Sequence, residues 1–338
     1  MGFDRRRLLT ASVALGFGLM SGCARAGSHE VRTLRGWNEF KAAFLAPEGR
    51  IVDTGNGGIS HSEGQGYAMV LAEAAGDRDA FDRLHGWTEK TLARPHDALF
   101  SWRFDPAQAV PVSDPNNATD GDLLIAWALL RAGDRWNNKG YRDRSQAIRD
   151  AIRSELVVRQ GPRALLLPGV VGFDQPARKT INLSYYIWSA LDAFRDADGS
   201  KAWGDVIKDG ERLVKEARFG PLALPVDWTD IAPDGTPSPA IDKPPRFGFD
   251  AIRLPLYLAM GGRKADADTI ARFWKGYIDL GRPIPAWVDV QTGEIAPYAV
   301  SPGGCDIVRK LLGNQALTCP PLAGPDYYSS VLQLLVQL

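Results

Sequence analysis

Three carboxylic acids occupy equivalent places in this sequence, each beside the start of an apolar run. Glu63 lies just ahead of YAMVLAEAA, Asp120 lies just ahead of LLIAWALLRA, and Asp250 directly precedes AIRLPLYLAM. A neutral carboxylic acid can protonate a leaving oxygen while an ionised carboxylate activates water, and hydrolysis of a glycosidic bond needs both roles. A single acid in the first turn of a helix is what the helix dipole favours anyway, so only the set of three together indicates such a site.

The apolar runs predict helices with sharply defined starts. Capping-box patterns, Ser62 to Gln65 and Thr119 to Asp122, precede the first two runs, and Asn182 to Ser184 leads into YYIWSALDAF. The stretch Leu123 to Leu130 is apolar on every face, which in a short segment predicts a helix that is buried all round. Such a helix needs an outer layer of other helices to cover it.

The spacing of these helix starts is nearly regular. Counted from Ser62, Thr119, Ser184 and Asp250, the intervals are 57, 65 and 66 residues, and each holds an amphipathic helix such as RSQAIRDAIRSELVV. This pattern predicts an all-α toroid of helical hairpins, with ALLLPGVVGF and AWVDVQTGE as minor β insertions; an irregular helical domain is the alternative. Because the inner helices of a toroid run in one direction, the three acids would meet at one end.

The composition argues against several other classes of function. The 338 residues carry 40 Lys and Arg against 40 Asp and Glu, so no global positive field would attract a nucleic acid. Three cysteines and four histidines form no CxxC or HExxH pattern, and we expect no metal ion and no cofactor. The stretch Gly55-Asn56-Gly57-Gly58 lacks the Lys-Ser/Thr of a phosphate-binding loop, and we interpret it as part of the cleft floor.

The first 26 residues are typical of an export signal. Arg5 to Arg7 precede the apolar run LLTASVALGFGLMSG, which is too short for a comfortable membrane span. Cleavage before Cys23 would give a lipoprotein and cleavage after Ala26 a soluble chain, and both a twin-arginine and a plain secretory route fit the arginines. We expect residues 1–26 to be a signal peptide, residues 27–338 to be a single domain, and the protein to be periplasmic or secreted.

Cys305 and Cys319 lie in the body of the chain. An oxidising compartment would permit a disulfide across the short Pro- and Gly-containing loop between them, and two unpaired thiols are the alternative. No histidine lies near either cysteine in sequence, so neither is a candidate nucleophile.

The three acid blocks resemble those of glycoside hydrolase family 8. The stretch Ala118 to Asp122, continuing through Ile125–Ala128 to Trp136, is similar to the signature of that family over its whole length. Ser62–Tyr67 and Phe249–Arg253 resemble the two other blocks, in the same order. Within the family, the chain resembles the exported endoglucanases that accompany bacterial cellulose synthase. This resemblance implies an (α/α)6 barrel and inverting hydrolysis of a β-1,4-linked glucan.

The resemblance also implies roles for individual residues. Glu63 takes the position of the proton donor, and Asp250 takes that of the base that activates water. Asp120 holds a position often described as the nucleophile; in an inverting scheme it would instead bind and distort the sugar at the scissile subsite, and which aspartate is better described as the base is left open. Arg253, one helical turn after Asp250, would hold that base ionised and oriented, with a surface ion pair as the alternative.

Aromatic side chains can form platforms for glucose rings, although most of the ten tryptophans and nine tyrosines must belong to the core. Tyr185 matches a tyrosine that the family places near the scissile bond, and Trp102 matches a tryptophan of a sugar subsite. Tyr67, one helical turn beyond the first acid, could contact the site. Trp127 lies inside a buried helix and is assigned to the core, and His61 is interpreted as structural rather than sugar-binding.

These observations predict an exported endo-β-1,4-glucanase that acts on cellulose-like chains during synthesis or export of an exopolysaccharide. Its expected partners are a β-1,4-glucan chain and, functionally, a cellulose synthase complex; we expect a monomer that binds no nucleic acid. Chitosan, xylan and mixed-linkage glucan are the alternative substrates, and endo versus exo action is left open. A non-catalytic glucan-binding lipoprotein is the competing class, and the presence of all three acids together with Arg253 argues against it.

Overall fold

The computed structural model describes residues 32–319, 321 and 324–338. The expected signal peptide and Cys23 fall outside the described residues. Within the described part of the chain, no helix is long and apolar enough to span a membrane.

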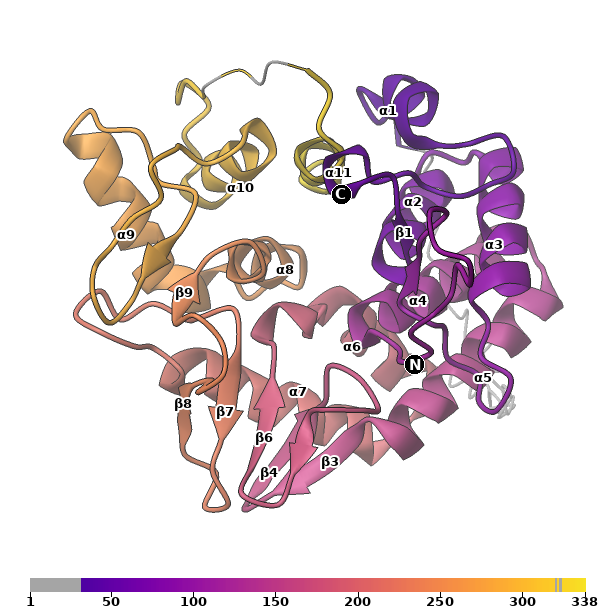
Figure 1. The fold of residues 1–338 in the computed structure, drawn as a ribbon, viewed down its shortest axis with the longest axis horizontal. Helices are drawn as coiled ribbons and strands as arrows, with labels where there is room; N and C mark the ends of the chain where they lie inside the picture. The colour runs from indigo at the N-terminus through magenta and orange to yellow at the C-terminus, as the bar shows by residue number, and fades with distance from the viewer. Residues whose placement is uncertain (1–31, 320, 322–323) are drawn as a thin grey trace, which may run out of the picture. The chain divides into compact units, whose positions relative to one another are not determined.

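Six helices form a closed inner ring. Each inner helix contacts the inner helix that follows it in the chain, and the last contacts the first, so that the ring closes on itself (Figure 1). In α4 every residue from Thr119 to Leu129 is buried, as its all-round apolar sequence predicts. The inner helices are α2(Ser62–Ala74), α4(Thr119–Arg135), α6(Trp188–Asp198), α8(Leu254–Met260), α10(Pro302–Leu312) and α11(Tyr327–Leu335).

An outer layer of amphipathic helices covers this ring, and inner and outer helices alternate from α1 to α10. In α5 the buried side chains Tyr141, Ser145, Ile148 and Ile152 recur at helical spacing and face the inner layer, while the opposite face is charged. This alternation confirms the predicted (α/α)6 barrel. The outer helices are α1(Trp37–Phe44), α3(Arg78–Leu92), α5(Lys139–Glu155), α7(Lys201–Glu216) and α9(Asp268–Asp279).

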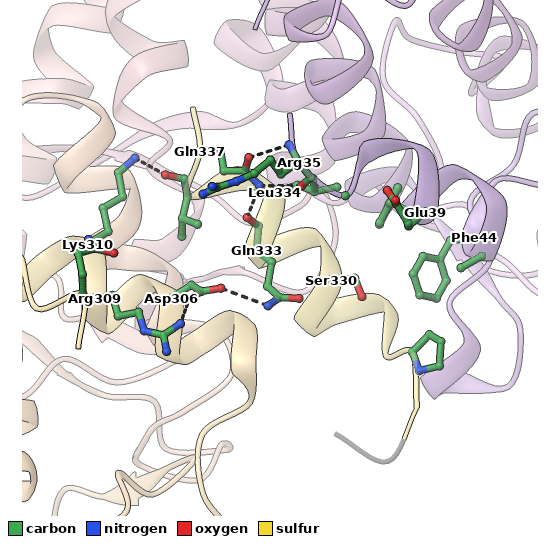
Figure 2. Close-up of a pocket in the computed structure, with 16 residues that line it drawn as sticks. Arg35, Glu39, Phe44, Asp306, Arg309, Lys310, Ser330, Gln333, Leu334 and Gln337 are labelled. Atoms are coloured by element: carbon green, nitrogen blue, oxygen red, sulfur yellow. Dashed lines mark hydrogen bonds and ion pairs between the residues drawn. The ribbon is translucent and has the colours of Figure 1, made fainter. Parts of the chain in front are cut away.

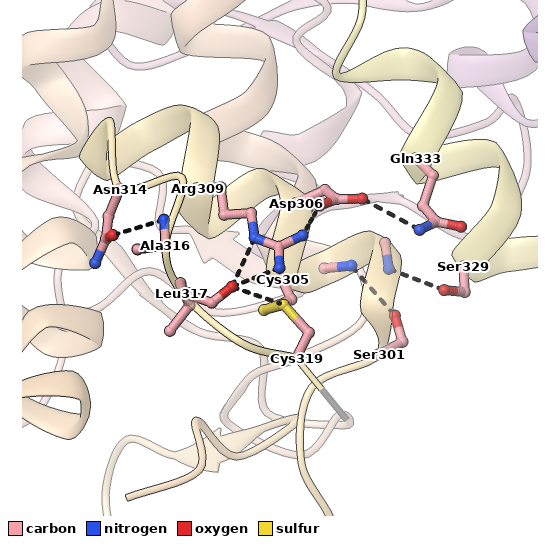
Figure 3. Close-up of a disulfide and its surroundings, with 12 residues drawn as sticks. Ser301, Cys305, Asp306, Arg309, Asn314, Ala316, Leu317, Cys319, Ser329 and Gln333 are labelled. Atoms are coloured by element: carbon pink, nitrogen blue, oxygen red, sulfur yellow. Dashed lines mark hydrogen bonds and ion pairs between the residues drawn. A yellow bond between two sulfur atoms is a disulfide. The ribbon is translucent and has the colours of Figure 1, made fainter. Parts of the chain in front are cut away.

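The outer layer is interrupted between α10 and α11, where the described residues contain no sixth outer helix. A cavity of about 670 Å³ occupies this place, lined by α1, α10, α11 and the residues beside them (Figure 2). None of the three acids lines it. The connection in this gap is tied to α10 by a disulfide between Cys305 and Cys319, whose Cα atoms are 6.1 Å apart (Figure 3).

The strands are short and lie in the connections between helices, as the two strand-like pieces of the sequence predict. ALLLPGVVGF contributes β4 to a hairpin, and AWVDVQTGE contributes β10 to a two-stranded pair. The largest sheet is antiparallel with the order β5-β6-β7-β8. The strands are β1(Ser60–His61), β2(Arg103–Phe104), β3(Val157–Gln160), β4(Arg163–Leu166), β5(Asp174–Gln175), β6(Arg178–Ile181), β7(Thr229–Ile231), β8(Pro237–Pro239), β9(Arg246–Phe247) and β10(Val288–Asp289).

The structure corrects the predicted helix caps. The cap of α2 is His61 and not Ser62, because the Nδ1 atom of His61 accepts the Gly64 N–H at 3.0 Å. The cap position of α4 is Ala118, which provides no side-chain acceptor, and Thr119 instead donates its hydroxyl to the Leu167 carbonyl at 2.6 Å. At α2 the imidazole of His61 thus takes the place of the expected serine cap, and at α4 the threonine hydroxyl binds the Leu167 carbonyl instead of a helix N–H.

Four short 3-10 helices complete the description, and two of them carry predicted site residues. They are η1(Thr54–Asn56), η2(Leu183–Tyr185), η3(Ala251–Arg253) and η4(Lys264–Ala267). Tyr185 lies in η2, which Asn182 caps by accepting the Ser184 N–H at 3.0 Å. Asp250 immediately precedes η3 and makes no side-chain cap bond there. The third acid is therefore carried by a tight turn at the start of α8, whereas the first two lie inside α-helices.

Candidate active site

The first two acids are brought together by a very close approach of α2 and α4. A Cβ atom added to Gly121 would lie 2.7 Å from the backbone nitrogen of Glu63, and one added to Gly66 would lie 2.5 Å from the Cβ of Leu124. Only glycine at these two positions lets the helix backbones come so near. Glu63 and Asp120, both in first turns, therefore lie at the same end of the ring.

Arg253 joins all three acids. Its buried guanidinium contacts the Glu63 carboxylate through Nη1, lies 3.5 Å from Asp120 Oδ2 through the same nitrogen, and donates to Asp250 Oδ1 at 2.5 Å through Nη2. Only 3% of its side chain is exposed, so this is not the surface ion pair that the sequence left open. A planar guanidinium with five donors is the side chain suited to holding several carboxylates at fixed angles.

A pair of tyrosines supports the Glu63 side of this cluster. Arg253 Nη1 donates to Tyr67 Oη at 3.0 Å, the Tyr67 and Tyr257 hydroxyls are 2.6 Å apart, and Tyr67 donates to Glu63 Oε1 at 3.1 Å. With Tyr257 as the donor of the pair, every lone pair and proton of the Tyr67 hydroxyl is used. Burial raises the pKa of Tyr67 well above its usual value, so this hydroxyl stays protonated and keeps its hydrogen bond to the acid.

Burial dominates the electrostatics of both aspartates. It raises the pKa of Asp120, which is 3% exposed, to about 7, although the Gly121 N–H donates to its Oδ1 at 2.8 Å and opposes this shift. Burial, followed by the negative charges of Asp227 and Asp120, raises the pKa of Asp250 well above that of a free aspartate. A carboxyl with a raised pKa is a stronger base once it is ionised, which suits a group that must take a proton from water.

A cavity of about 810 Å³ opens at the acids and is large enough for several water molecules or part of a sugar chain. Glu63, Asp250 and Arg253 line it, and so do Gly55 and Asn56 of the loop that was expected to form part of the cleft floor. Aromatic side chains also line it: Phe249 is 54% exposed and Tyr298 is 53% exposed, and Tyr328 lies beside them. Exposed aromatic rings next to paired acids are typical of a carbohydrate-binding cleft.

The other predicted residues lie close to this cluster. The Tyr185 ring is 5.9 Å from the Arg253 guanidinium carbon, and burial raises the pKa of Tyr185 well above its usual value. Trp102 accepts the Ser62 N–H through its carbonyl at 3.0 Å, and its indole donates to Asp114 at 2.7 Å. Trp102 is therefore hydrogen-bonded through its backbone to Ser62, the residue before Glu63. Trp127 is buried in the core, as expected. Within the described residues, no cluster of three or more His, Cys, Asp or Glu side chains is arranged to hold a metal ion.

Some residues of the site were not found from the sequence. Tyr257 lies one helical turn after Arg253, and that spacing was a signal that could have identified it. The hydroxyl oxygen of Ser184 accepts a hydrogen bond from Arg253 Nη2 at 3.2 Å, and no spacing relative to Arg253 in the sequence indicates this contact. Asp227, more than twenty residues before Asp250, contacts the loop of the third acid, and nothing in its local sequence indicates this role.

Comparisons with known proteins show the family of the chain. The family model of glycosyl hydrolases family 8 matches residues 4–338. A probable endoglucanase of Novacetimonas hansenii is 43% identical over 307 residues, which cover 89% of each chain. An endoglucanase of Cellulomonas uda is 42% identical over 283 residues, covering 83% of this chain and 78% of the relative.

Solved structures of the same family have the same fold. The endo-β-1,4-glucanase CMCax of Acetobacter xylinum superposes with a TM-score of 0.83 at 42% sequence identity, covering 89% of this chain and 95% of that one. The chain therefore belongs to glycosyl hydrolase family 8. Its enzyme class is that of a glycoside hydrolase, and the named relatives are endoglucanases.

Proposed function

We propose that this protein is an endo-β-1,4-glucanase that hydrolyses cellulose-like glucan with inversion, using Glu63 as the general acid and Asp250 as the base. The observation that carries the proposal is the arrangement of Arg253, whose single guanidinium contacts all three carboxylates beside the cavity that Glu63 and Asp250 line. A protein that only bound a glucan would not need a proton donor and a base held around one cation.

In the proposed reaction, a water molecule attacks the anomeric carbon while the bond from that carbon to the glycosidic oxygen breaks. Glu63 gives its proton to the leaving oxygen, and Asp250 accepts the proton that the water loses. Arg253 contacts Glu63 through Nη1 and Asp250 through Nη2. Arg253 keeps Asp250 oriented and favours its ionised form, in spite of the burial that raises the pKa of Asp250.

Asp120 is proposed to bind the sugar at the scissile subsite rather than to take the proton of the water. Its Oδ1 already accepts the Gly121 N–H, and its side chain is almost fully buried beside α2. Its raised pKa of about 7 lets it exist as either acceptor or donor toward a sugar hydroxyl. Tyr185, whose ring stands near Arg253, would lie beside the same sugar.

The proposed substrate rests on the relatives and on the aromatic residues. The named relatives are endoglucanases, and the exposed rings of Phe249 and Tyr298 at the cavity can stack on the apolar faces of glucose units. Trp102 is proposed as a further platform next to Glu63. Chitosan, xylan and mixed-linkage glucan remain the alternative substrates of the same site.

The decisive experiment measures viscosity loss and reducing-end release from soluble carboxymethyl cellulose, with chitosan and xylan in parallel. We expect rapid viscosity loss on the cellulose derivative, abolished in Glu63→Gln while binding of cello-oligosaccharides persists. Anomeric NMR of a short cello-oligosaccharide should show the α-anomer as the first product. Activity on chitosan or xylan alone would overturn the substrate, and binding without hydrolysis would favour the scaffold alternative.

The export of the protein and its role in cellulose synthesis are part of the same proposal. The positively charged and apolar N-terminal sequence supports export, and the resemblance to endoglucanases that accompany cellulose synthase supports action on the polymer of the producing cell. Mass spectrometry of the mature protein would distinguish a lipidated Cys23 from a chain that begins after Ala26. Deletion in a cellulose-producing host should change the amount or the crystallinity of the polymer.

A further inference from the structure

The loop that carries Asp250 is held by a second aspartate, Asp227. One oxygen of that carboxylate, Oδ1, accepts three backbone N–H groups of the loop: from Gly248 at 3.1 Å, from Asp250 at 3.1 Å and from Ala251 at 2.7 Å. A carboxylate oxygen that accepts several backbone N–H groups is an effective clamp, because charged acceptors form the stronger hydrogen bonds. The backbone on both sides of Asp250 is thus fixed to one side chain.

Other contacts hold the same loop and the same aspartate. The Tyr328 hydroxyl donates to the Phe249 carbonyl at 2.5 Å, and the Asp227 N–H donates to the Arg246 carbonyl at 2.7 Å. A Cβ atom on Gly248 would come within 2.6 Å of Asp227 Oδ2, so only glycine lets the carboxylate approach the loop. These contacts hold the Asp227 carboxylate against the turn before η3.

The charges around Asp250 come from several elements. Arg253 of η3 is the cation bonded to it, Asp120 of α4 and Asp227 are its anionic neighbours, and Glu63 of α2 shares Arg253 with it. Three tyrosines with neutral phenols also surround the site: Tyr185 in η2, Tyr328 in α11 and Tyr257 in α8. Burial raises the pKa of Asp227, and the positive charge of Arg246 in β9 opposes this effect. Among these groups, Asp227 is both a backbone anchor and a negative charge beside the proposed base.

We propose that Asp227 is a positioning residue for hydrolysis: its carboxylate fixes the turn that carries Asp250 and places a negative charge beside that proposed base. The inference rests on the proposed function, in which Asp250 takes a proton from water. Without the clamp, the turn would sample positions in which Asp250 no longer faces the water it must activate, and small displacements of a catalytic group are costly.

Electrostatics gives this inference a sign that can be measured. The charge of Asp227 raises the pKa of Asp250, and burial raises the pKa of Asp227 itself to about 6. Because the base must be ionised, activity falls on the acidic side as Asp250 takes up a proton. Removing the negative charge of Asp227 should therefore lower the pKa of Asp250 and move this acidic limb to lower pH.

The experiment compares Asp227→Asn with Asp227→Ala. The amide of Asp227→Asn keeps an oxygen for the three N–H groups but loses the charge, so we expect the acidic limb of kcat/KM to move down by about one pH unit with plateau kcat within about threefold of wild type. Asp227→Ala loses the clamp as well, and kcat should fall about 10–100-fold while KM changes little.

Asp230→Asn is the matched control. Asp230 lies three residues further on, is buried, and accepts hydrogen bonds from Thr180 at 2.6 Å and Ile241 at 3.1 Å instead of the Asp250 loop. We expect the acidic limb of the kcat/KM profile of Asp230→Asn to lie at the same pH as in the wild type. Gly248→Ala, which keeps the charge but displaces the carboxylate, should lower kcat, and it serves as the second variant if Asp227→Ala does not fold.

A titration by NMR makes the result independent of any substrate. With 13C-labelled aspartate and the Asp250 signal assigned through Asp250→Asn, the apparent pKa of Asp250 should be lower in Asp227→Asn than in the wild type. An unchanged titration of Asp250, or a wild-type kcat in a folded Asp227→Ala, would overturn the inference. Failure of the wild-type protein to hydrolyse any glucan would overturn the proposed function instead, and the titration would still decide the role of Asp227.

Discussion

The two aspartates of the site are held in similar ways but by different parts of the chain. Asp120 lies in the first turn of the long helix α4, two residues before the buried Asp122, whose carboxylate accepts the Phe100 N–H at 2.9 Å and the Asn117 amide at 2.8 Å. Asp250 lies before the short turn η3 and is held by Asp227, which is distant in sequence. Asp122 thus ties the first turn of α4 to Phe100 and Asn117, whereas Asp227 binds the backbone of the turn that carries Asp250.

The difference lies in how freely each acid could move. The turn of Asp120 is wedged against α2 by Gly121, and its carboxylate is almost fully buried. The side chain of Asp250 is 27% exposed and faces the cavity, with Phe249 beside it. The Asp120 region is therefore fixed by helix packing and the Asp250 region by hydrogen bonds to side chains. The proposed sugar-binding acid therefore belongs to the packed core, whereas the proposed base lies on a turn that needs its own clamp.

The largest expected effect comes from removing the residue that links the two regions. Arg253→Lys keeps a positive charge but cannot present two nitrogens to three carboxylates, so we expect kcat/KM on carboxymethyl cellulose to fall about 1000-fold. The thermal midpoint of unfolding should be measured beside the activity. A loss of less than about tenfold in a folded variant would show that the two regions do not depend on a shared cation.

A smaller effect is expected from separating α2 and α4 at the Asp120 region. Gly121→Ala would place a methyl group against Glu63, and we expect the free energy of unfolding in urea to fall by about 1–3 kcal/mol together with a loss of activity. Gly204→Ala is the control, because Gly204 lies in the outer helix α7 with open space around it. The free energy of unfolding of that variant should rise by about 0.5–1 kcal/mol. Equal effects of the two changes would contradict the close packing of Gly121 against α2.

The buried carboxylates also predict how stability depends on pH. Burial raises the pKa of Asp120 and Asp122 to about 7 and that of Asp227 to about 6, all above the values in an unfolded chain. The folded state then binds more protons than the unfolded state between about pH 4 and pH 7, so stability should fall as the pH rises through this range.

The Asp122→Asn variant sharpens this test. The amide cannot ionise, so the decline of the thermal midpoint between about pH 5 and pH 7 should be shallower than in the wild type, by the equivalent of about 1–2 kcal/mol. Asp205→Asn is the control, since Asp205 is partly exposed and its pKa is lowered, chiefly by a hydrogen bond from Lys201. A wild-type slope in Asp122→Asn would mean that Asp122 is not the group that takes up the proton.

The smallest expected effects concern the aromatic residues beside the two regions. Trp102→Ala, next to the Glu63 and Asp120 side, and Phe249→Ala, next to Asp250, should each raise KM for cello-oligosaccharides about 3–10-fold with little change in kcat. Tyr277→Ala on the outer helix α9 is the control and should leave KM unchanged. Comparing chain lengths would show which region holds more of the glucan.

Much of the site could be predicted from the sequence because it lies in the first turns of strongly apolar helices. The helix starts at Glu63 and Asp120 and the turn of Arg253 are local features, and their regular spacing indicated one end of a toroid. The caps were wrong for a physical reason: His61 and the Leu167 carbonyl provide bonds that no local pattern specifies. The disulfide could be offered only as an alternative, because the distance between Cys305 and Cys319 depends on how the last loop packs on α10.

The sequence by itself determined the alternation of buried and amphipathic helices and the three acids that begin the buried ones, since hydrophobic periodicity is a local property. Only the tertiary structure decided that Arg253 contacts three carboxylates instead of one, and that Tyr67 joins Arg253 to Tyr257 through hydrogen bonds. The same holds for the clamp between Asp227 and the Asp250 loop. Such contacts join residues far apart in the chain, and their energies depend on distances and burial that arise only when the ring of helices closes.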